Sequence, residues 1–108
     1  MKNSIVWTTL AASSLLLTAT SLLPEFQAAD KKLNQVYQQL QPKLNSKQKQ
    51  RLIVAQRSWL KFRDESCDYE AGYFEGGSVA PSIYGYCRAR VTKERIKDLE
   101  GYLEQASL

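Results

Sequence analysis

Two cysteines carry the most reactive side chains of this 108-residue chain, and they limit the chemistry that is open to it. The chain has no histidine, the commonest general base and metal ligand. Cys67 and Cys87 are the only cysteines, so they serve either as free thiols or as the two ends of one disulfide. A disulfide would leave neither a thiol nucleophile nor a Cys-x-x-Cys redox motif. We therefore predict that the protein is not an enzyme and uses no cofactor.

The remaining candidate chemical groups are weak. Asp64 and Asp68 share one face of a predicted helix because they are four residues apart. A lysine-rich, solvated surface explains them better than a metal site, and we expect no metal. The segment Glu75-Gly76-Gly77-Ser78 is rich in glycine but lacks the Lys-Ser/Thr ending of a phosphate-binding loop.

The N-terminus has the pattern of a secretory signal peptide, which we place at residues 1–29. Met1-Lys2-Asn3 gives a positive start, and no charged residue occurs from Ile5 to Leu23. The alternative is a retained membrane anchor, because this apolar run is just long enough to span a bilayer. Cleavage near Ala19-Thr20-Ser21 or near Gln27-Ala28-Ala29 fits the pattern, so the cleavage point stays open between residues 19 and 29. A cleaved leader would contact the membrane only transiently.

Residues 30–108 are then one small periplasmic or secreted domain. A core of this size is only marginally stabilising, so a covalent link would matter. In an oxidising compartment two lone cysteines usually pair, and we predict a Cys67–Cys87 disulfide. The closed loop of roughly 20 residues would contribute about 3 kcal/mol. Two free, buried thiols are the alternative.

The hydrophobic pattern predicts three helices. The first runs from Asp30, as N-cap, to about Leu40 or Gln41, where Pro42 ends it. A second begins at Asn45 and continues to about Phe74 without glycine or proline until Gly72, and a third covers Ser82 to Leu103, after a Gly- and Pro-containing loop at residues 75–81. We predict an all-α fold, a small three-helix domain with a long antiparallel helical hairpin closed by one disulfide.

A helical wheel places some polar side chains on apolar faces. The predicted apolar face of the second helix contains Leu52, Ala55, Trp59, Phe62, Ser66 and Tyr73. Arg63 and Gln56 fall within or beside this face, and Arg95 falls on the apolar face of the third helix. A buried charge needs a partner or access to water. An architectural role, with Glu70 as one candidate partner for Arg63, is favoured over an anion-binding pair of arginines.

The charge pattern excludes one class of partner. The net charge is +4, and along the whole chain lysine and arginine alternate with aspartate and glutamate without a basic stripe. We therefore expect no nucleic-acid partner. A plain solvated surface is the favoured interpretation, and attraction to anionic polymers or lipids is the alternative.

Several short motifs follow one another in a familiar order. These are Leu33-Asn34-x-x-Tyr37, Ala55-Gln56-Arg57-x-Trp59-x-x-Phe62-Arg63-Asp64-x-x-Cys67, Gly76-Gly77-Ser78, Cys87, and Thr92-x-x-Arg95-x-x-x-Leu99. Their succession resembles the family built around the N-terminal domain of the lysozyme inhibitor LprI, over nearly all of residues 30–108. The Gln-x-x-Trp-x-x-x-Arg-Asp-x-x-Cys block is the most specific part.

The resemblance implies an exported, helical, disulfide-linked bacterial domain and, for one branch, inhibition of lysozyme. Many members have further cysteines upstream, which this chain lacks. The family motif maps onto Gln56, Trp59, Arg63, Asp64, Cys67, Cys87, Thr92 and Arg95. Most of these point inward on the wheel, so we expect them to specify the fold. A net charge of +4 gives no long-range attraction to basic lysozymes.

We expect an exported cell-envelope binding module that inhibits a lysozyme-type hydrolase or binds another envelope protein. The alternative is a structural envelope protein that binds an anionic glycan or lipid and inhibits nothing. The candidate contact is the loop after the second helix, with nearby aromatic residues. Its residues are Tyr73, Glu75, Gly76, Gly77 and Ser78. A second small core around the disulfide is an equally good explanation for the aromatic residues.

Overall fold

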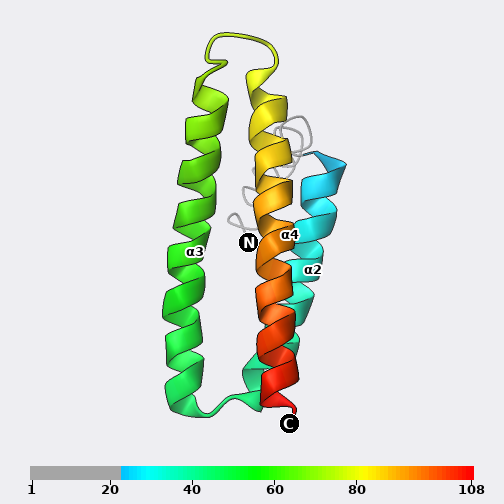
Figure 1. Cartoon of the computed structure of the whole chain (residues 1–108), viewed down its shortest axis with the longest axis vertical. Coiled ribbons are helices and arrows are strands. Elements are labelled where there is room, and N and C mark those ends of the chain that lie inside the picture. The colour runs from blue at the N-terminus through cyan, green and yellow to red at the C-terminus, as the bar shows by residue number, and fades with distance from the viewer. Residues whose placement is uncertain (1–22) are drawn as a thin grey trace, which may run out of the picture.

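A computed structural model describes residues 23–108, which form three α-helices and no strand. The helices are α2 (Pro24–Leu40), α3 (Ser46–Gly72) and α4 (Ala80–Ala106), and a short 3-10 helix, η1 (Gln41–Lys43), links α2 to α3. Figure 1 shows α3 and α4 as a long antiparallel pair joined by one loop, with α2 along α4. The predicted all-α hairpin is confirmed.

The first helix begins six residues earlier than we predicted. Pro24 occupies its first turn, where a missing backbone N–H costs nothing. Asp30 therefore lies inside α2, and its prediction as the N-cap is wrong. The end of the helix at Leu40 is as expected, and Pro42 lies in η1. Most of the predicted leader, residues 1–22, lies outside the described residues.

Local sequence signals explain both ends of α3. The Asn45 side chain caps the helix by accepting a hydrogen bond from the backbone N–H of Gln48 at 2.8 Å. The Gln48 side chain does not complete a capping box but accepts from Arg51 at 2.8 Å. At the other end the loop follows Gly72, and Gly76 has a φ of 84°, which favours glycine.

Most of the core lies between α2 and α4. Leu33, Leu40 and Leu99 are almost completely buried there. A smaller core surrounds Cys67 and Cys87 between α3 and α4. Trp59 packs against both cores but is only half-buried, so it joins the two and is not the centre of one. Along residues 23–108, no helix combines the length and the apolar character needed to cross a membrane.

The face of α3 that we predicted to be buried is rotated in the structure. Its buried residues are Leu52, Gln56, Arg63, Cys67 and Ala71. Phe62 is 59% exposed and Tyr73 is 74% exposed, so their placement in the core is wrong. The wheel assigned aromatic residues to the interior by their hydrophobicity, whereas the disulfide turns the face containing Cys67 toward α4.

Candidate functional site

Arg63 is buried in the interior with polar partners on all three helices. Its side chain extends from α3, and the residue is only 4% exposed. The Nε group donates a 2.8 Å hydrogen bond to Asp64 Oδ1, and Nη1 donates a long one, 3.5 Å, to Thr92 Oγ1 on α4. Nη1 also lies 3.8 Å from an Asp30 carboxylate oxygen on α2. The charge is therefore paired, as a buried cation requires.

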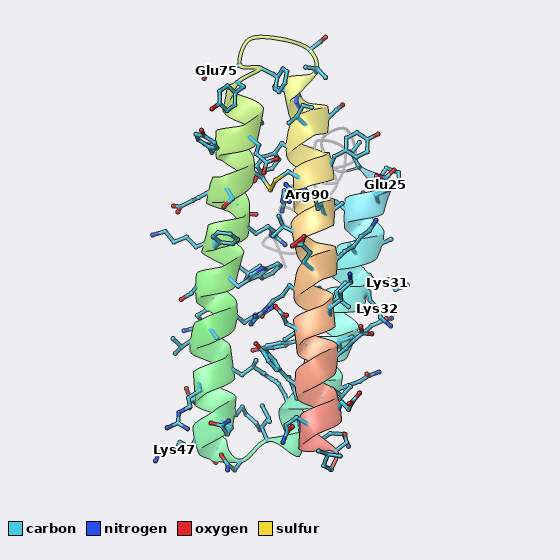
Figure 2. All side chains as sticks on the ribbon, in the orientation of Figure 1. Glu25, Lys31, Lys32, Lys47, Glu75 and Arg90 are labelled. Atoms are coloured by element: carbon cyan, nitrogen blue, oxygen red, sulfur yellow. A yellow bond between two sulfur atoms is a disulfide. The ribbon has the colours of Figure 1, made fainter. Side chains whose placement is uncertain are left out.

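Glu70 is not the partner of Arg63, so that candidate pairing is wrong. Glu70 instead accepts a 2.8 Å charged hydrogen bond from Arg90 Nη2. This ion pair joins α3 to α4 next to the disulfide. Figure 2 shows Arg90 between the two helices, beside the sulfur–sulfur bond.

Arg95 is the second buried cation, 9% exposed, on α4. Its Nε donates a 3.0 Å hydrogen bond to Gln56 Oε1 on α3, and its Nη1 lies 3.8 Å from Asp98. The Gln56 amide, which the wheel placed beside the apolar face, thus links the two long helices. The wheel placed Arg63 and Arg95 on apolar faces, and the burial of both side chains is confirmed.

Aromatic rings and arginines alternate in one continuous stack, which we call the arginine ladder. Its members in order are Tyr84, Arg88, Phe26, Arg63, Trp59, Arg95 and Tyr102. Distances from guanidinium carbon to ring centroid run from 4.0 Å, for Arg88 on Phe26, to 5.9 Å, for Arg95 on Trp59. All three helices contribute to the ladder. Cation–π contacts of this kind are stronger when water is excluded.

The ladder favours the architectural interpretation of the arginines. Arg63 and Arg95 both face the Trp59 ring, and each already has a polar partner on another helix. Neither arginine lines the hollows at the two ends of the hairpin. These contacts join the helices to one another.

The predicted disulfide between Cys67 and Cys87 is present. It joins α3 to α4 near the loop, on the turn of α4 that precedes Arg90. The crosslink and the Glu70–Arg90 ion pair both join α3 to α4 shortly before the loop. The loop therefore follows directly on the cross-linked turns of the hairpin.

The loop and the last turns of α3 form an exposed surface, which we call the loop-end surface and define as residues 68–79. All the predicted contact residues are exposed there, and Figure 2 shows Glu75 at the tip. Tyr84 packs in the small core at the disulfide, whereas Tyr69 and Phe74 are exposed. A shallow hollow of about 630 Å³ runs along this surface beside Gly76. Tyr84 therefore belongs to the second small core that we predicted around the disulfide, whereas Tyr69, Tyr73 and Phe74 are accessible to a partner.

Tyr69 and Tyr73 form an ordered pair on the loop-end surface. Their rings meet edge to face at a centroid distance of 5.4 Å, and their hydroxyl oxygens are 2.7 Å apart in a hydrogen bond. This hydrogen bond raises the pKa of Tyr69 above its ordinary value. Two large rings are thus held in one arrangement while remaining exposed.

Charge is strongly polarised along α3. Residues 41–63 contain seven lysines and arginines and no acidic residue, whereas residues 64–87 contain five acidic residues and no lysine or arginine. The expectation that basic and acidic residues alternate along the chain is therefore wrong for residues 41–87. The loop-end surface is therefore acidic on a protein whose net charge is +4.

The opposite end of the molecule contains a second hollow, of about 450 Å³, between α3 and α4. Leu44, Leu52 and Tyr102 contribute to its lining. Lys43 and Arg51 also line it, and none of its lining residues is acidic. Figure 2 shows Lys47 at this same end, where α3 begins.

Comparison with known proteins identifies the family. The sequence profile of the lysozyme inhibitor LprI family matches residues 17–99. The chain belongs to the lysozyme inhibitor LprI family. It is also 27% identical, over 95 residues, to an uncharacterized protein of Rhizobium meliloti (strain 1021), R02472, in an alignment that covers 76% of this chain and 68% of the relative. No solved structure matches the chain.

Residues of the LprI motif mostly belong to the interior network described above. Trp59, Arg63 and Arg95 are members of the ladder, and Gln56, Asp64 and Thr92 are their hydrogen-bond partners. Sequence reasoning missed Phe26 because the predicted leader included it. It also missed the acidic end of α3, which counting charges separately in each half of the helix would have found.

Proposed function

We propose that this chain is an exported protein that binds a basic, lysozyme-type hydrolase through its loop-end surface and inhibits it. Membership of the LprI family supports the inhibitory role, and the disulfide supports an oxidising compartment. One observation carries the choice of surface. Exposed aromatic rings and carboxylates without an ion-pair partner in residues 23–108 occur together at the disulfide-linked end of the hairpin.

Electrostatics favour this end of the molecule for a basic partner. Charges on an exposed surface act over about one Debye length, roughly 8–10 Å at physiological salt. A docking enzyme therefore responds to the local charge more than to the net +4. The carboxylates of Asp68 and Glu75 have no ion-pair partner within residues 23–108, so both are open to a partner's cations.

Pre-organisation supports tight binding. Tyrosine is a common interface anchor because it buries a large ring and offers a hydroxyl. Tyr69 and Tyr73 are already fixed against each other, so little side-chain entropy is lost on binding. The disulfide limits movement of the supporting helices in the same way. Inhibition then requires only that a bound protein covers the enzyme's cleft.

The test is inhibition and binding of a basic animal-type lysozyme by the oxidised protein and two loop-end variants. We expect Tyr73→Ala and Glu75→Ala each to weaken binding about tenfold, which corresponds to about 1.4 kcal/mol. Matched controls are Val54→Ala and Glu104→Ala, which remove an exposed apolar group and an exposed carboxylate away from the loop. All four proteins should melt like the wild type. If both loop-end variants bind as well as the controls do, the loop is only a connector.

A second candidate function is attachment to an anionic glycan or lipid, without inhibition. The hollow at the opposite end favours it, because its apolar lining carries Lys43 and Arg51 and no acidic group. Sedimentation with purified cell wall or with anionic vesicles tests it. Attachment through this end should weaken with salt and with Arg51→Ala, whereas Glu75→Ala should leave it unchanged.

A further inference from the structure

We propose that the leader is removed by hydrolysis of the Ser21–Leu22 peptide bond, so that the mature protein keeps residues 23–29, which pack against the rest of the domain. This inference depends on the predicted signal peptide and not on the inhibitory role. The sequence alone leaves two candidate cleavage regions open. The packing of the described residues that follow the first region, 23–29, distinguishes between them.

Phe26 is the strongest of these structural observations. Phe26 is 4% exposed, and the guanidinium carbons of Arg63 and Arg88 lie 5.1 and 4.0 Å from its ring centroid. Cleavage after Ala29 would remove the only ring of the ladder that α2 contributes. The buried Arg63 and the half-buried Arg88 would then lose the ring that lies between them.

The packing of Leu23 and Ala29 also favours retention of this segment. A Cβ atom built on Gly85 of α4 would lie 2.8 Å from Leu23 Cγ, so Leu23 packs directly on the α4 backbone where a side chain would not fit. Ala29 is buried in the main core. A glycine at the middle of a helix is costly unless such a close contact requires it.

The residues at the two candidate cleavage regions agree with the packing. Small side chains at the first and third positions before the cut are the mark of a leader cleavage site. A cut after Ser21 places Ser21 and Ala19 at these positions. A cut after Ala29 places Gln27 at the third position, and a cut after Ala28 places Phe26 there.

The reaction is a simple hydrolysis by an endopeptidase of the export pathway. One water molecule is consumed, and the C–N bond between Ser21 and Leu22 breaks. Ser21 becomes the carboxylate end of the released leader, and Leu22 becomes the ammonium end of the mature protein. The new terminus then lies one residue before Leu23, which keeps its contact with Gly85.

The intact mass and N-terminal sequence of the full chain, after export in a bacterial host, test the cleavage point. We expect a protein that begins at Leu22. Ser21→Gln should accumulate the uncut precursor, whereas Ala28→Gln, at an exposed position of α2, should be processed normally. A mature protein that begins at Ala29 or Asp30, or a wild-type chain that stays uncut, would overturn the proposal.

Melting of the exported Gly85→Ala variant provides an independent test of whether the segment is retained. Alanine favours a helix over glycine, so this change should raise the melting temperature if Leu23 has been removed. If Leu23 is present, its clash with the new methyl group should lower the melting temperature instead. Gly101→Ala, where a Cβ meets no atom within 4 Å, is the control and should raise it. An unchanged or higher melting temperature for Gly85→Ala would contradict the proposal.

Discussion

Arg63 illustrates how a small helical domain can contain a buried cation. Its guanidinium plane contacts two aromatic rings, and its N–H groups point to a carboxylate and a hydroxyl. Arginine suits this position because it stacks and donates in several directions at once, which lysine does not. The helical wheel correctly predicted that Arg63 is covered. It does not contain the reason, which is the contact of Arg63 with Phe26 on α2 and with Thr92 on α4.

Replacement of Arg63 should be among the most destabilising single changes in the domain. We expect Arg63→Ala to lower the free energy of unfolding by about 3 kcal/mol, because the change removes one partner of a buried network. Arg63→Lys should cost about 1.5 kcal/mol, since the charge remains but the stacking and the directed hydrogen bonds are lost. Urea titration followed by circular dichroism measures both.

The control for Arg63 is Arg57→Ala, which removes an exposed arginine of the same helix. It should change the free energy of unfolding by less than about 0.5 kcal/mol. If Arg57→Ala and Arg63→Ala destabilise the protein equally, the stacked environment of Arg63 contributes nothing of its own.

The helices themselves could be predicted from the sequence more fully than the faces they bury. Asn45 and Gly72 mark the ends of α3, and the glycines of the loop mark the reversal. The start of α2 was missed because residues 24–29 were assigned to the leader. The buried face of α3 was misplaced because its polar residues find partners only through tertiary contacts, which periodicity does not show.

The disulfide should matter mainly through the unfolded state, by closing a loop between residues 20 apart in the sequence. A doubly substituted protein, Cys67→Ser with Cys87→Ser, should be less stable by about 3 kcal/mol. Wild-type protein in a reducing buffer should show a similar loss, whereas the variant should not respond to the reductant. If the variant melts like oxidised wild type, the crosslink does not stabilise the hairpin.

At the scale of the whole molecule, the net charge conceals a polarity. The basic half of α3 and the acidic end of the hairpin lie at opposite ends of the structure, where Figure 2 shows Lys47 and Glu75. The electrostatic objection to a basic partner, drawn from the net charge of +4, applies only to a protein with evenly spread charge. A polarised domain attracts a basic enzyme at one end and repels it at the other, so charge also orients the encounter.

This polarity predicts how binding to a basic lysozyme depends on salt and on the position of a charge. The association rate should fall as salt is added, while the dissociation rate changes little, because long-range attraction acts mainly on encounter. Glu75→Lys should slow association at low salt. Glu104→Lys changes the net charge equally, but at an exposed position near the far end of α4, and should have little effect. Stopped-flow measurement of the association rate of both variants tests whether local charge or net charge governs the encounter. Equal slowing by the two substitutions would mean that net charge, and not the acidic loop end, governs it.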